Sequence, residues 1–413
     1  MGQGKDVVVV GAGIVGICCA RWLQQEGYRV RVLDPEPPGS GCSLGNAGVF
    51  ALDSVIPLAT PATLAAVPGM LFDATGPLAL RWSYLPRLLP WMLRFASNAR
   101  PSRVASATRA LESLCGRGMQ DLLSLVKHRP TESLLRPTGW MTVFETRAGL
   151  HAGQREAQLK ANHGVDSRIL GRNDVRTLIP GIADHVVGGV LYPDCWMCTD
   201  PQALVQGMAR DFVESGGVLQ RTAARRIQAA PGRVCVATED DPVEAEHVVV
   251  AAGAHSRALS RSLGDDVPLD TERGYHVMMP GAELLPPMPV MSGEYKFVAT
   301  PMDGGLRLAG TSELGGLELP PDPRRIGAIV ERARRLYPGL RAPVDSDWMG
   351  FRPTLPDSVP VIGRATRHRN VSYAFGHQHL GLTLAGVTAR LIADDVAGRE
   401  SVVDMHPFRV NRF

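Results

Sequence analysis

The stretch VVVVGAGIVG, residues 7–16, decides the fold of this chain. Four consecutive valines are typical of a strand buried on both faces of a parallel sheet. Gly11, Gly13 and Gly16 follow with the spacing G-x-G-x-x-G. In a dinucleotide-binding unit the first glycine permits a tight turn, the second lets a pyrophosphate approach the backbone, and the third lets the helix pack closely on the strand. The stretch therefore predicts a strand, a phosphate-binding turn and the start of a helix.

The residues that follow complete such a unit. Residues 14–27 predict a helix, and YRVRVLD at 28–34 alternates as a second strand. Asp34 ends that strand, 18 residues after the third glycine. An acidic side chain there suits the hydroxyls of a ribose and disfavours a 2′-phosphate. We expect a dinucleotide to bind here, and the glycine loop alone leaves both FAD and NAD open.

The bulk composition is that of an ordinary globular chain. It has 413 residues, of which 45% are hydrophobic and 21% charged, and this length favours two domains. A net charge of +3 without a long basic tract disfavours a nucleic-acid partner. Seven scattered cysteines fit free thiols in a reducing compartment. We expect neither a signal peptide, because of the regular glycine spacing, nor an apolar run long enough to span a bilayer.

Segments of a different composition lie between the segments that are predicted to bind the nucleotide. Prolines recur from 57 to 100, strand-like stretches rich in proline and glycine occupy 269–320, and a basic amphipathic helix is predicted over 324–337. Buried strands like that of the first βαβ unit are predicted again at 248–256 and 371–375. The sequence therefore predicts a nucleotide-binding domain in several pieces, with insertions that form a second domain.

Five motifs, in a fixed order, make a family resemblance specific. They are VVVVGAGIVG…LD at the start, GCSLGNAG at 41–48, VVVAAGAHS at 248–256, GFRPTLPDSVPVIG at 350–363 and GHQHLGLTLAG at 376–386. Together they resemble the FAD-dependent amine oxidoreductase family that includes D-amino acid dehydrogenase, glycine oxidase and sarcosine oxidase. The residues ERGYHVMM at 272–279 and the motif GHQHLGLT are most similar to those of the bacterial D-amino acid and D-hydroxyproline dehydrogenases.

The resemblance implies an α/β protein with a Rossmann-like FAD-binding domain and an inserted α+β substrate domain that contains an antiparallel sheet. We expect the FAD-binding domain in three parts, residues 1–60, 195–268 and 341–413. The substrate domain, or cap, is then expected in two parts, residues 61–194 and 269–340.

The resemblance also implies which residues contact FAD. The candidates are Gly11, Gly13, Ile14, Val15, Gly16 and Asp34 in the first unit, Ser43, Asn46, Ala47 and Gly48 in the next loop, Ala224 beside the adenine, Gly253 in a late turn, and Gly381, Leu382 and Thr383 near the flavin O2 region. Sarcosine oxidases that hold flavin covalently use a cysteine just before the Pro-Asp motif. No cysteine lies between Asp347 and Pro360, so we expect noncovalent FAD.

Four residues are candidates for substrate binding or catalysis. Arg352 matches the carboxylate-binding arginine of the family, and a guanidinium is planar, permanently charged and able to donate two parallel hydrogen bonds. His379 stands where glycine oxidase-like relatives carry a basic residue that faces the substrate. Tyr275 and His276 fall in a strand of the substrate domain, where they either line the pocket or pack on the sheet.

Other patterns favour structural roles. His377 and His379 have no carboxylate or thiol beside them in GHQHLG, so we expect no metal and assign His377 to packing beside the flavin ring. Cys195 and Cys198 form a C-x-x-C without a second pair at zinc spacing. The Arg-, Trp- and Leu-rich stretch 78–95 is either an interfacial helix, a lid, or a helix that faces the other domain.

The expected activity is FAD-dependent dehydrogenation of a D-amino or imino acid, such as D-proline or hydroxy-D-proline, with hydride transfer from Cα to flavin N5. Electrons then pass to an acceptor other than oxygen, either a quinone or partner electron-transfer subunits. The alternatives are a flavin subunit that is inactive alone, an oxygen-using oxidase of the glycine or sarcosine type, and an NAD-dependent dehydrogenase. We expect a cytoplasmic protein, with or without peripheral contact to the inner membrane.

Overall fold

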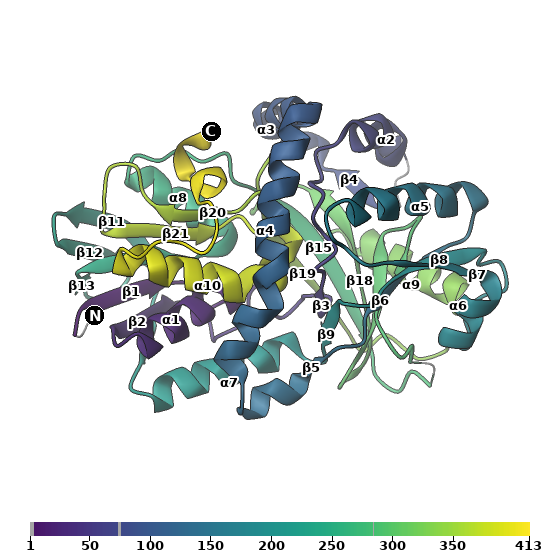
Figure 1. Cartoon of the computed structure of the whole chain (residues 1–413), viewed down its shortest axis with the longest axis horizontal. Coiled ribbons are helices and arrows are strands. Elements are labelled where there is room, and N and C mark those ends of the chain that lie inside the picture. Colours follow the sequence, from purple (N-terminus) through teal and green to yellow (C-terminus); the bar gives the residue numbers. More distant parts are fainter. Residues whose placement is uncertain (1–3, 73–75, 284) are drawn as a thin grey trace.

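A six-stranded sheet forms one half of the molecule, on the left in Figure 1. The computed structural model describes residues 4–72, 76–283 and 285–413. The strands pair in the order β10-β2-β1-β14-β21-β20, and every pair is parallel except β20 with β21. Their bounds are Val218–Arg221 (β10), Arg29–Asp34 (β2), Asp6–Val10 (β1), His247–Val250 (β14), Val371–Phe375 (β21) and Val361–Arg364 (β20).

Alternate valines of β1 point to opposite faces of this sheet, and other elements pack on them on both faces. Val7 and Val9 belong to the cluster that includes the helices α1 and α10. Val8 and Val10 belong to a second cluster, with α8 and a small antiparallel sheet. The covering elements are α1 (Ile14–Gln25), α10 (Gly381–Ala397), α8 (Ser256–Ser262), β11 (Ala224–Ala230), β12 (Arg233–Thr238) and β13 (Val243–Ala245).

A second, largely antiparallel sheet forms the other half, on the right in Figure 1. Its order is β19-β15-β18-β17-β16-β6-β8-β7, with β4 paired to β18. The bounds are Ser346–Thr354 (β19), Asp270–Met279 (β15), Gly305–Leu314 (β18), Phe297–Met302 (β17), Val290–Ser292 (β16), Trp140–Phe144 (β6), Gly188–Tyr192 (β8), Arg168–Gly171 (β7) and Leu78–Leu80 (β4). One face of this sheet packs on α9 (Pro323–Leu336) through Ile329, Ala333 and Leu336.

The long helix α4 (Pro101–Val126) crosses the middle of the molecule and packs on α10 (Figure 1). Glycines allow the two backbones to approach. A Cβ at Gly118 would lie 2.4 Å from the carbonyl oxygen of Thr383, and a Cβ at Gly386 would lie 2.3 Å from the backbone nitrogen of Leu122. The other elements are α2 (Pro61–Phe72), α3 (Leu85–Asn98), α5 (Arg147–Ala161), α6 (Arg172–Leu178), α7 (Pro201–Glu214), β3 (Val49–Phe50), β5 (Leu135–Arg136) and β9 (Trp196–Cys198).

The predicted fold class is confirmed, since a parallel sheet built on the glycine unit stands beside a mixed sheet with antiparallel strands. The six-stranded sheet collects its strands from residues 6–34, 218–250 and 361–375, which are far apart in the sequence. The limits proposed for the two domains stay a prediction.

The glycine contact between α4 and α10 can be tested within one helix. Gly118→Ala should destabilise the fold by about 1–3 kcal/mol, because the new methyl group meets a backbone oxygen that cannot move away easily. Gly116→Ala is the control, since nothing lies within 4 Å of that position and alanine is favoured over glycine in a helix by about 0.8–1.0 kcal/mol. Thermal unfolding of the two variants should move in opposite directions, and equal shifts would contradict the proposed contact.

Candidate functional site

A single large cavity of about 2840 Å³ lies between the two sheets. Its lining runs from the glycine loop after β1 to the inner face of the antiparallel sheet. Sites for small ligands usually have volumes of about 300–1,000 Å³. The cavity is therefore large enough for a dinucleotide and for a second, smaller molecule beside it.

The glycine loop has the geometry that its spacing predicts. Gly11 has a φ of 112°, and a Cβ there would lie 2.4 Å from the carbonyl oxygen of Ala251. A Cβ at Gly16 would lie 1.9 Å from the carbonyl oxygen of Gly11, so only glycine lets α1 sit this close to the loop. Gly13 caps α1 without a side-chain hydrogen bond, and the first turn holds no acidic residue. The free N–H groups of this turn suit a bound phosphate.

Two side chains brace the same loop. Asp34 Oδ2 accepts a hydrogen bond of 2.7 Å from the Ala12 N–H, and Ser43 Oγ accepts one of 3.1 Å from the Ile14 N–H. Burial raises the pKa of Asp34, and the hydrogen bonds from the Ala12 and Glu36 N–H groups oppose that rise. Because Asp34 lines the cavity at the end of β2, its carboxylate stands where a ribose would lie.

The start of α10 gives the cavity a second helix N-terminus. Gly381 and Leu382 line the cavity, the preceding Leu380 makes no side-chain cap, and the first turn of α10 has no acidic residue. Partial positive charge gathers at such a helix start. It would stabilise negative charge on a ligand held between α10 and the antiparallel sheet.

Most of the predicted FAD contacts line the cavity. They are Gly11, Gly13, Ile14, Val15, Asp34, Ser43, Asn46, Ala47, Ala224, Gly253, Gly381 and Leu382. Gly16, Gly48 and Thr383 do not line it, and their contact with FAD stays a prediction. Gly16 lies under the loop. Gly48 has a φ of 72°, and a Cβ there would lie 2.5 Å from the carbonyl oxygen of Cys198. Thr383 Oγ1 accepts a hydrogen bond of 3.1 Å from the Ala51 N–H.

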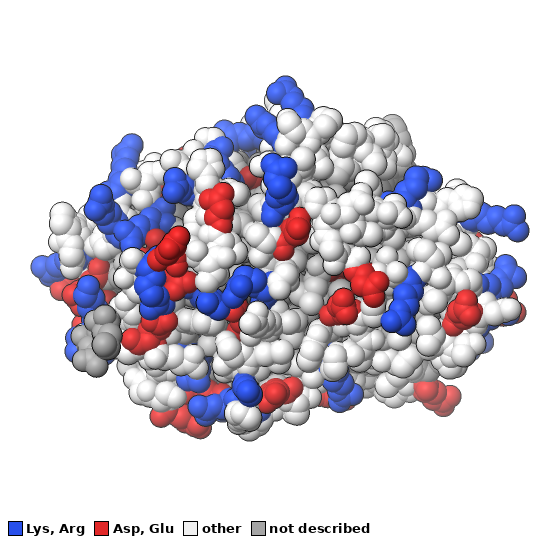
Figure 2. Space-filling model, in the orientation of Figure 1, with Lys and Arg blue, Asp and Glu red and all other residues white. Residues whose placement is uncertain are grey.

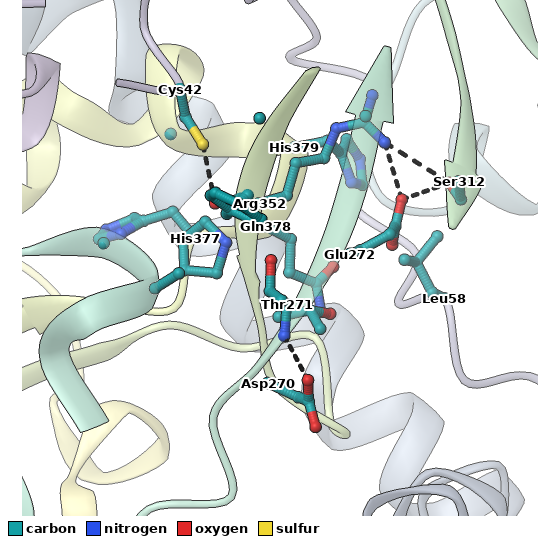
Figure 3. A pocket seen from close by; sticks show the side chains of 18 of the residues that line it. Cys42, Leu58, Asp270, Thr271, Glu272, Ser312, Arg352, His377, Gln378 and His379 are labelled. Atoms are coloured by element: carbon teal, nitrogen blue, oxygen red, sulfur yellow. Dashed lines mark hydrogen bonds and ion pairs between the residues drawn. The ribbon is translucent and has the colours of Figure 1, made fainter. Parts of the chain in front are cut away.

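Arg352, on β19, lies on the cavity wall and is paired with Glu272 on β15 (Figure 3). Its Nη1 donates to Glu272 Oε1 at 2.8 Å, and Ser312 on β18 donates to the same oxygen. The guanidinium lies over Gly274, where a Cβ would come within 2.4 Å of Nη2. Since the neighbouring strand has no side chain at this point, the arginine can lie flat against it.

His379 lies beside this pair and also faces the cavity (Figure 3). Burial lowers the pKa of His379, an effect that the Glu272 charge partly offsets and the Arg352 charge reinforces. Burial by itself would raise the pKa of Glu272, but the Arg352 charge and the Ser312 hydrogen bond bring it below its ordinary value. At neutral pH the site thus holds a cation, a carboxylate and an uncharged imidazole.

Tyr275 and His276 are not among the residues that line the cavity, and their role at the site stays a prediction. Side chains alternate along β15, and with Glu272 and Gly274 on the cavity side, Tyr275 points to the opposite side. Its hydroxyl is bonded to Glu313 and accepts the Asp322 N–H at 3.0 Å. His276 stacks on Trp348 at 5.3 Å between ring centres.

Glu272 is not among the residues predicted from the sequence, although it begins the ERGYH motif and stands two residues before Gly274, hence on the same face of the strand. A polar cluster on another part of the cavity wall was not predicted either. There Lys160 Nζ lies 2.9 Å from Asp53 Oδ2 and 2.8 Å from Glu156 Oε1. Asp53 and Lys160 are about a hundred residues apart in the chain, so no local pattern could join them.

The other residues singled out in the sequence, His377, Cys195 and Cys198, have structural roles. His377 Nε2 lies 3.0 Å from Thr388 Oγ1, and burial lowers the pKa of His377 to about 3. Cys195 and Cys198 are buried free thiols, and burial raises the pKa of Cys198 to about 12. Within the described part of the chain, no three residues of metal-binding type come together.

The sequence profile of the family described as FAD dependent oxidoreductase (DAO) matches residues 6–395. The chain belongs to this family. Its cofactor is FAD, and it is an oxidoreductase. Over the whole of both chains it is 36% identical to a "D-amino-acid oxidase" of Bradyrhizobium diazoefficiens. It is 31% identical to "D-amino acid dehydrogenase 2" of Ralstonia nicotianae, with 98% of this chain and 100% of that protein covered.

Solved structures show the same fold at lower identity. Glycine oxidase from Geobacillus kaustophilus superposes with a TM-score of 0.78 and 21% identity, covering 100% of this chain and 99% of that one. L-proline dehydrogenase from P. horikoshii gives a TM-score of 0.77 at 16% identity, with 100% and 98% covered. At these identities the likeness concerns the fold.

FAD binding should depend on Asp34. Asp34→Ala removes an acceptor for the Ala12 N–H and a carboxylate at the ribose position, and hydrogen bonds to charged groups contribute about 1.5–3 kcal/mol each. The affinity of the apoprotein for FAD should fall roughly tenfold to a hundredfold. Titration of the apoprotein, followed by quenching of flavin fluorescence, measures the change. Asp240→Ala, an exposed acid in the same half, is the control, and equal affinities in the two variants would contradict the role of Asp34.

Proposed function

We propose that this chain oxidises the Cα–N bond of a D-amino or cyclic imino acid, such as D-proline or hydroxy-D-proline, and delivers the electrons to an acceptor other than oxygen. The observation that carries the proposal is the group of Arg352, Glu272 and His379 on the cavity wall (Figure 3). It offers a cation, an anion and a neutral base within one small region. A zwitterionic substrate presents the complementary charges.

Arg352 is proposed to hold the substrate carboxylate. Only its Nη1 has a hydrogen-bond partner among the described residues, and Nη1 is already committed to Glu272. The donors on Nε and Nη2 therefore remain for a ligand, in the planar arrangement that suits two carboxylate oxygens. The contact with Glu272 and the flat surface of Gly274 keep the guanidinium in one orientation before substrate arrives.

Glu272 is proposed to position the substrate amine. Its Oε1 is engaged by Arg352 and Ser312, whereas Oε2 has no hydrogen-bond partner among the described residues. A substrate ammonium group beside Arg352 would therefore find an acceptor. The uncharged ring of His379 can take a proton from that ammonium group, or bond to a ring hydroxyl, because its lowered pKa leaves a free lone pair at neutral pH.

These residues orient the substrate for loss of the Cα hydrogen with its electron pair, while the nitrogen lone pair forms the C=N bond. When bound, FAD supplies the two-electron acceptor for this hydride. Water then hydrolyses an open-chain imine to a keto acid and ammonia, and a cyclic substrate leaves as a pyrroline.

Two other functions have support. The resemblance to a protein named "D-amino-acid oxidase" favours oxygen as the acceptor, and the resemblance to a "D-amino acid dehydrogenase" favours a different acceptor. A flavin subunit that works only within a larger electron-transfer complex would have the same cavity. We propose a quinone or partner electron-transfer subunits as the acceptor, and a cytoplasmic location with peripheral contact to the inner membrane.

An anaerobic substrate screen tests the proposal. D-Proline, hydroxy-D-proline, other D-amino acids and their L-enantiomers are mixed with the purified protein, and loss of the flavin absorption bands scores reduction. We expect bleaching by D-substrates, fast recovery on addition of a soluble quinone and slow recovery in air. Reduction by the L-series alone would overturn the proposal. Fast recovery in air would identify an oxidase, and bleaching without turnover with any acceptor would favour the subunit function.

Removal of the Glu272 charge should weaken binding of amines selectively. For Glu272→Gln we expect the KM of an amino acid substrate to rise about tenfold or more, because a charged hydrogen bond contributes about 1.5–3 kcal/mol. Binding of a carboxylate without an amine, such as cyclopentanecarboxylate, should stay within about threefold. Arg352→Lys is the companion variant and should weaken both ligands, with flavin retained. Equal losses for both ligands in Glu272→Gln would contradict the role of Glu272.

The pH dependence gives a second readout. Because the pKa of Glu272 in the folded protein lies below its ordinary value of 4.5, its contribution to amine binding should persist down to that pH and disappear only as the pH falls through the lowered pKa. The Glu272→Gln variant should lack this acid limb in plots of inhibitor affinity for amine ligands.

A further inference from the structure

The outer side of α3 and of the turn before it exposes large apolar side chains. Trp82, Leu89 and Leu93 are 68%, 50% and 64% exposed. Leu89 and Leu93 are four residues apart on α3 and therefore point to the same side of the helix. We call Trp82, Leu89 and Leu93 the apolar ridge. Helix α3 is labelled at the top of the molecule in Figure 1.

Residues 61–70 of helix α2 are also incompletely buried. Its sequence PATLAAVPGMLF has no charged residue, and none of residues 61–70 is buried. A helix that is apolar on all sides is ordinarily buried in a core or in a lipid phase. The apolar ridge therefore exposes three large apolar side chains, and α2 adds an uncharged helix whose Leu64, Val67 and Met70 line the cavity.

The charged residues of the segment that carries the ridge all have one sign. Residues 76–111 contain no Asp or Glu and hold six arginines, Arg81, Arg87, Arg94, Arg100, Arg103 and Arg109. Arg81 pairs with Glu313 and Arg87 pairs with Glu318. The other four form no ion pair with any described residue. Figure 2 shows basic side chains along the upper edge of the molecule, above α3. The partner of this surface should therefore be both apolar and negatively charged.

The opposite sides of the same helices line the cavity. Leu64, Val67 and Met70 of α2 and Trp91, Met92 and Phe95 of α3 are lining residues. Trp91 stacks on Phe95 at 5.2 Å between ring centres. The two helices thus form a largely apolar wall between the cavity and the outer surface that carries the ridge. Among the described residues of α2 and α3, Arg87 is the one charged residue that lines the cavity, and it pairs with Glu318, so an apolar molecule would pass beside this one ion pair.

We propose that the apolar ridge and its arginines dock on an anionic lipid membrane, and that a quinone dissolved in the bilayer reaches the cavity between α2 and α3. The quinone would take up the two electrons removed from the substrate together with two protons, and leave as a quinol. The route of the quinone rests on the proposed oxidation reaction, whereas the membrane contact, which gives a surface to the location proposed above, does not depend on that reaction. No helix among the described residues has the length and apolarity to cross a membrane.

Vesicle sedimentation tests the contact without any turnover. The purified holoenzyme is mixed with vesicles of phosphatidylcholine alone, or of phosphatidylcholine with phosphatidylglycerol. We expect binding to the anionic vesicles only, and weaker binding at high salt, because salt screens exposed charges. Leu93→Glu and Arg94→Glu should each reduce the partition coefficient at least about fivefold, since one basic residue near an anionic surface contributes about 1 kcal/mol.

Matched control variants lie on α7, at the bottom of Figure 1. Val213→Glu replaces an apolar residue that is 46% exposed, and Arg210→Glu reverses an exposed arginine. Neither should change vesicle binding. All four substitutions lie outside the cavity lining, so flavin content and turnover with a soluble dye should stay unchanged, which keeps this test separate from the proposed function.

Three results would overturn the proposal. The first is an absence of binding to either kind of vesicle, and the second is an equal loss in the α7 controls. The third is a dimer, seen by light scattering, that Leu93→Glu dissociates, since it would assign the ridge to a second copy of the chain. If membrane binding holds, turnover with a long-chain quinone in vesicles should fall in Leu93→Glu, while turnover with a short, water-soluble quinone should not.

Discussion

The close contact between backbones at glycine positions is the constraint on which the rest of this structure depends. Gly16 lets α1 lie against the turn at Gly11, where any Cβ would meet a carbonyl oxygen at 1.9 Å. Gly118 and Gly386 bring α4 onto α10 in the same way. These contacts aim the starts of α1 and α10 into one cavity, so two helix N-termini whose own N-cap residues make no side-chain bond face the same ligand site. A larger side chain at Gly11 or Gly16 would separate strand, helix and ligand together.

Several charges on the cavity wall are held by partners of opposite charge, which limits the desolvation that unpaired ions would suffer. Lys160 is held by Asp53 and Glu156, and burial and these partners leave little freedom for its ammonium group. The pair of Arg352 and Glu272 differs because each partner keeps unused hydrogen-bonding capacity toward the cavity. A pair of that kind is oriented before the substrate binds. It can still bind a zwitterion, with Arg352 at the carboxylate and Glu272 at the amine.

The helices α2 and α3 connect this chemistry with the outside. Their inner sides line the cavity, and their outer sides expose the apolar ridge in a region where arginine is the one charged residue type from 76 to 111. An enzyme that removes two electrons from a polar substrate must pass them to a second molecule. The proposed arrangement lets an amino acid reach one side of the cofactor site from water while an apolar acceptor reaches the cavity through lipid.

The sequence by itself determined the first βαβ unit, because glycine spacing and the valine run are local patterns with direct physical meaning, and the resemblance of its five motifs to a known family implied the FAD cofactor and the role of Arg352. Only the tertiary structure decided which residues share the site. It placed Glu272 of β15 beside Arg352 of β19 across a strand pair, and it turned Tyr275 away, since side chains alternate along a strand and its register cannot be known from one strand alone. It likewise joined Asp53 to Lys160 and gave α3 both an inner and an outer apolar side, because such contacts depend on how distant segments pack.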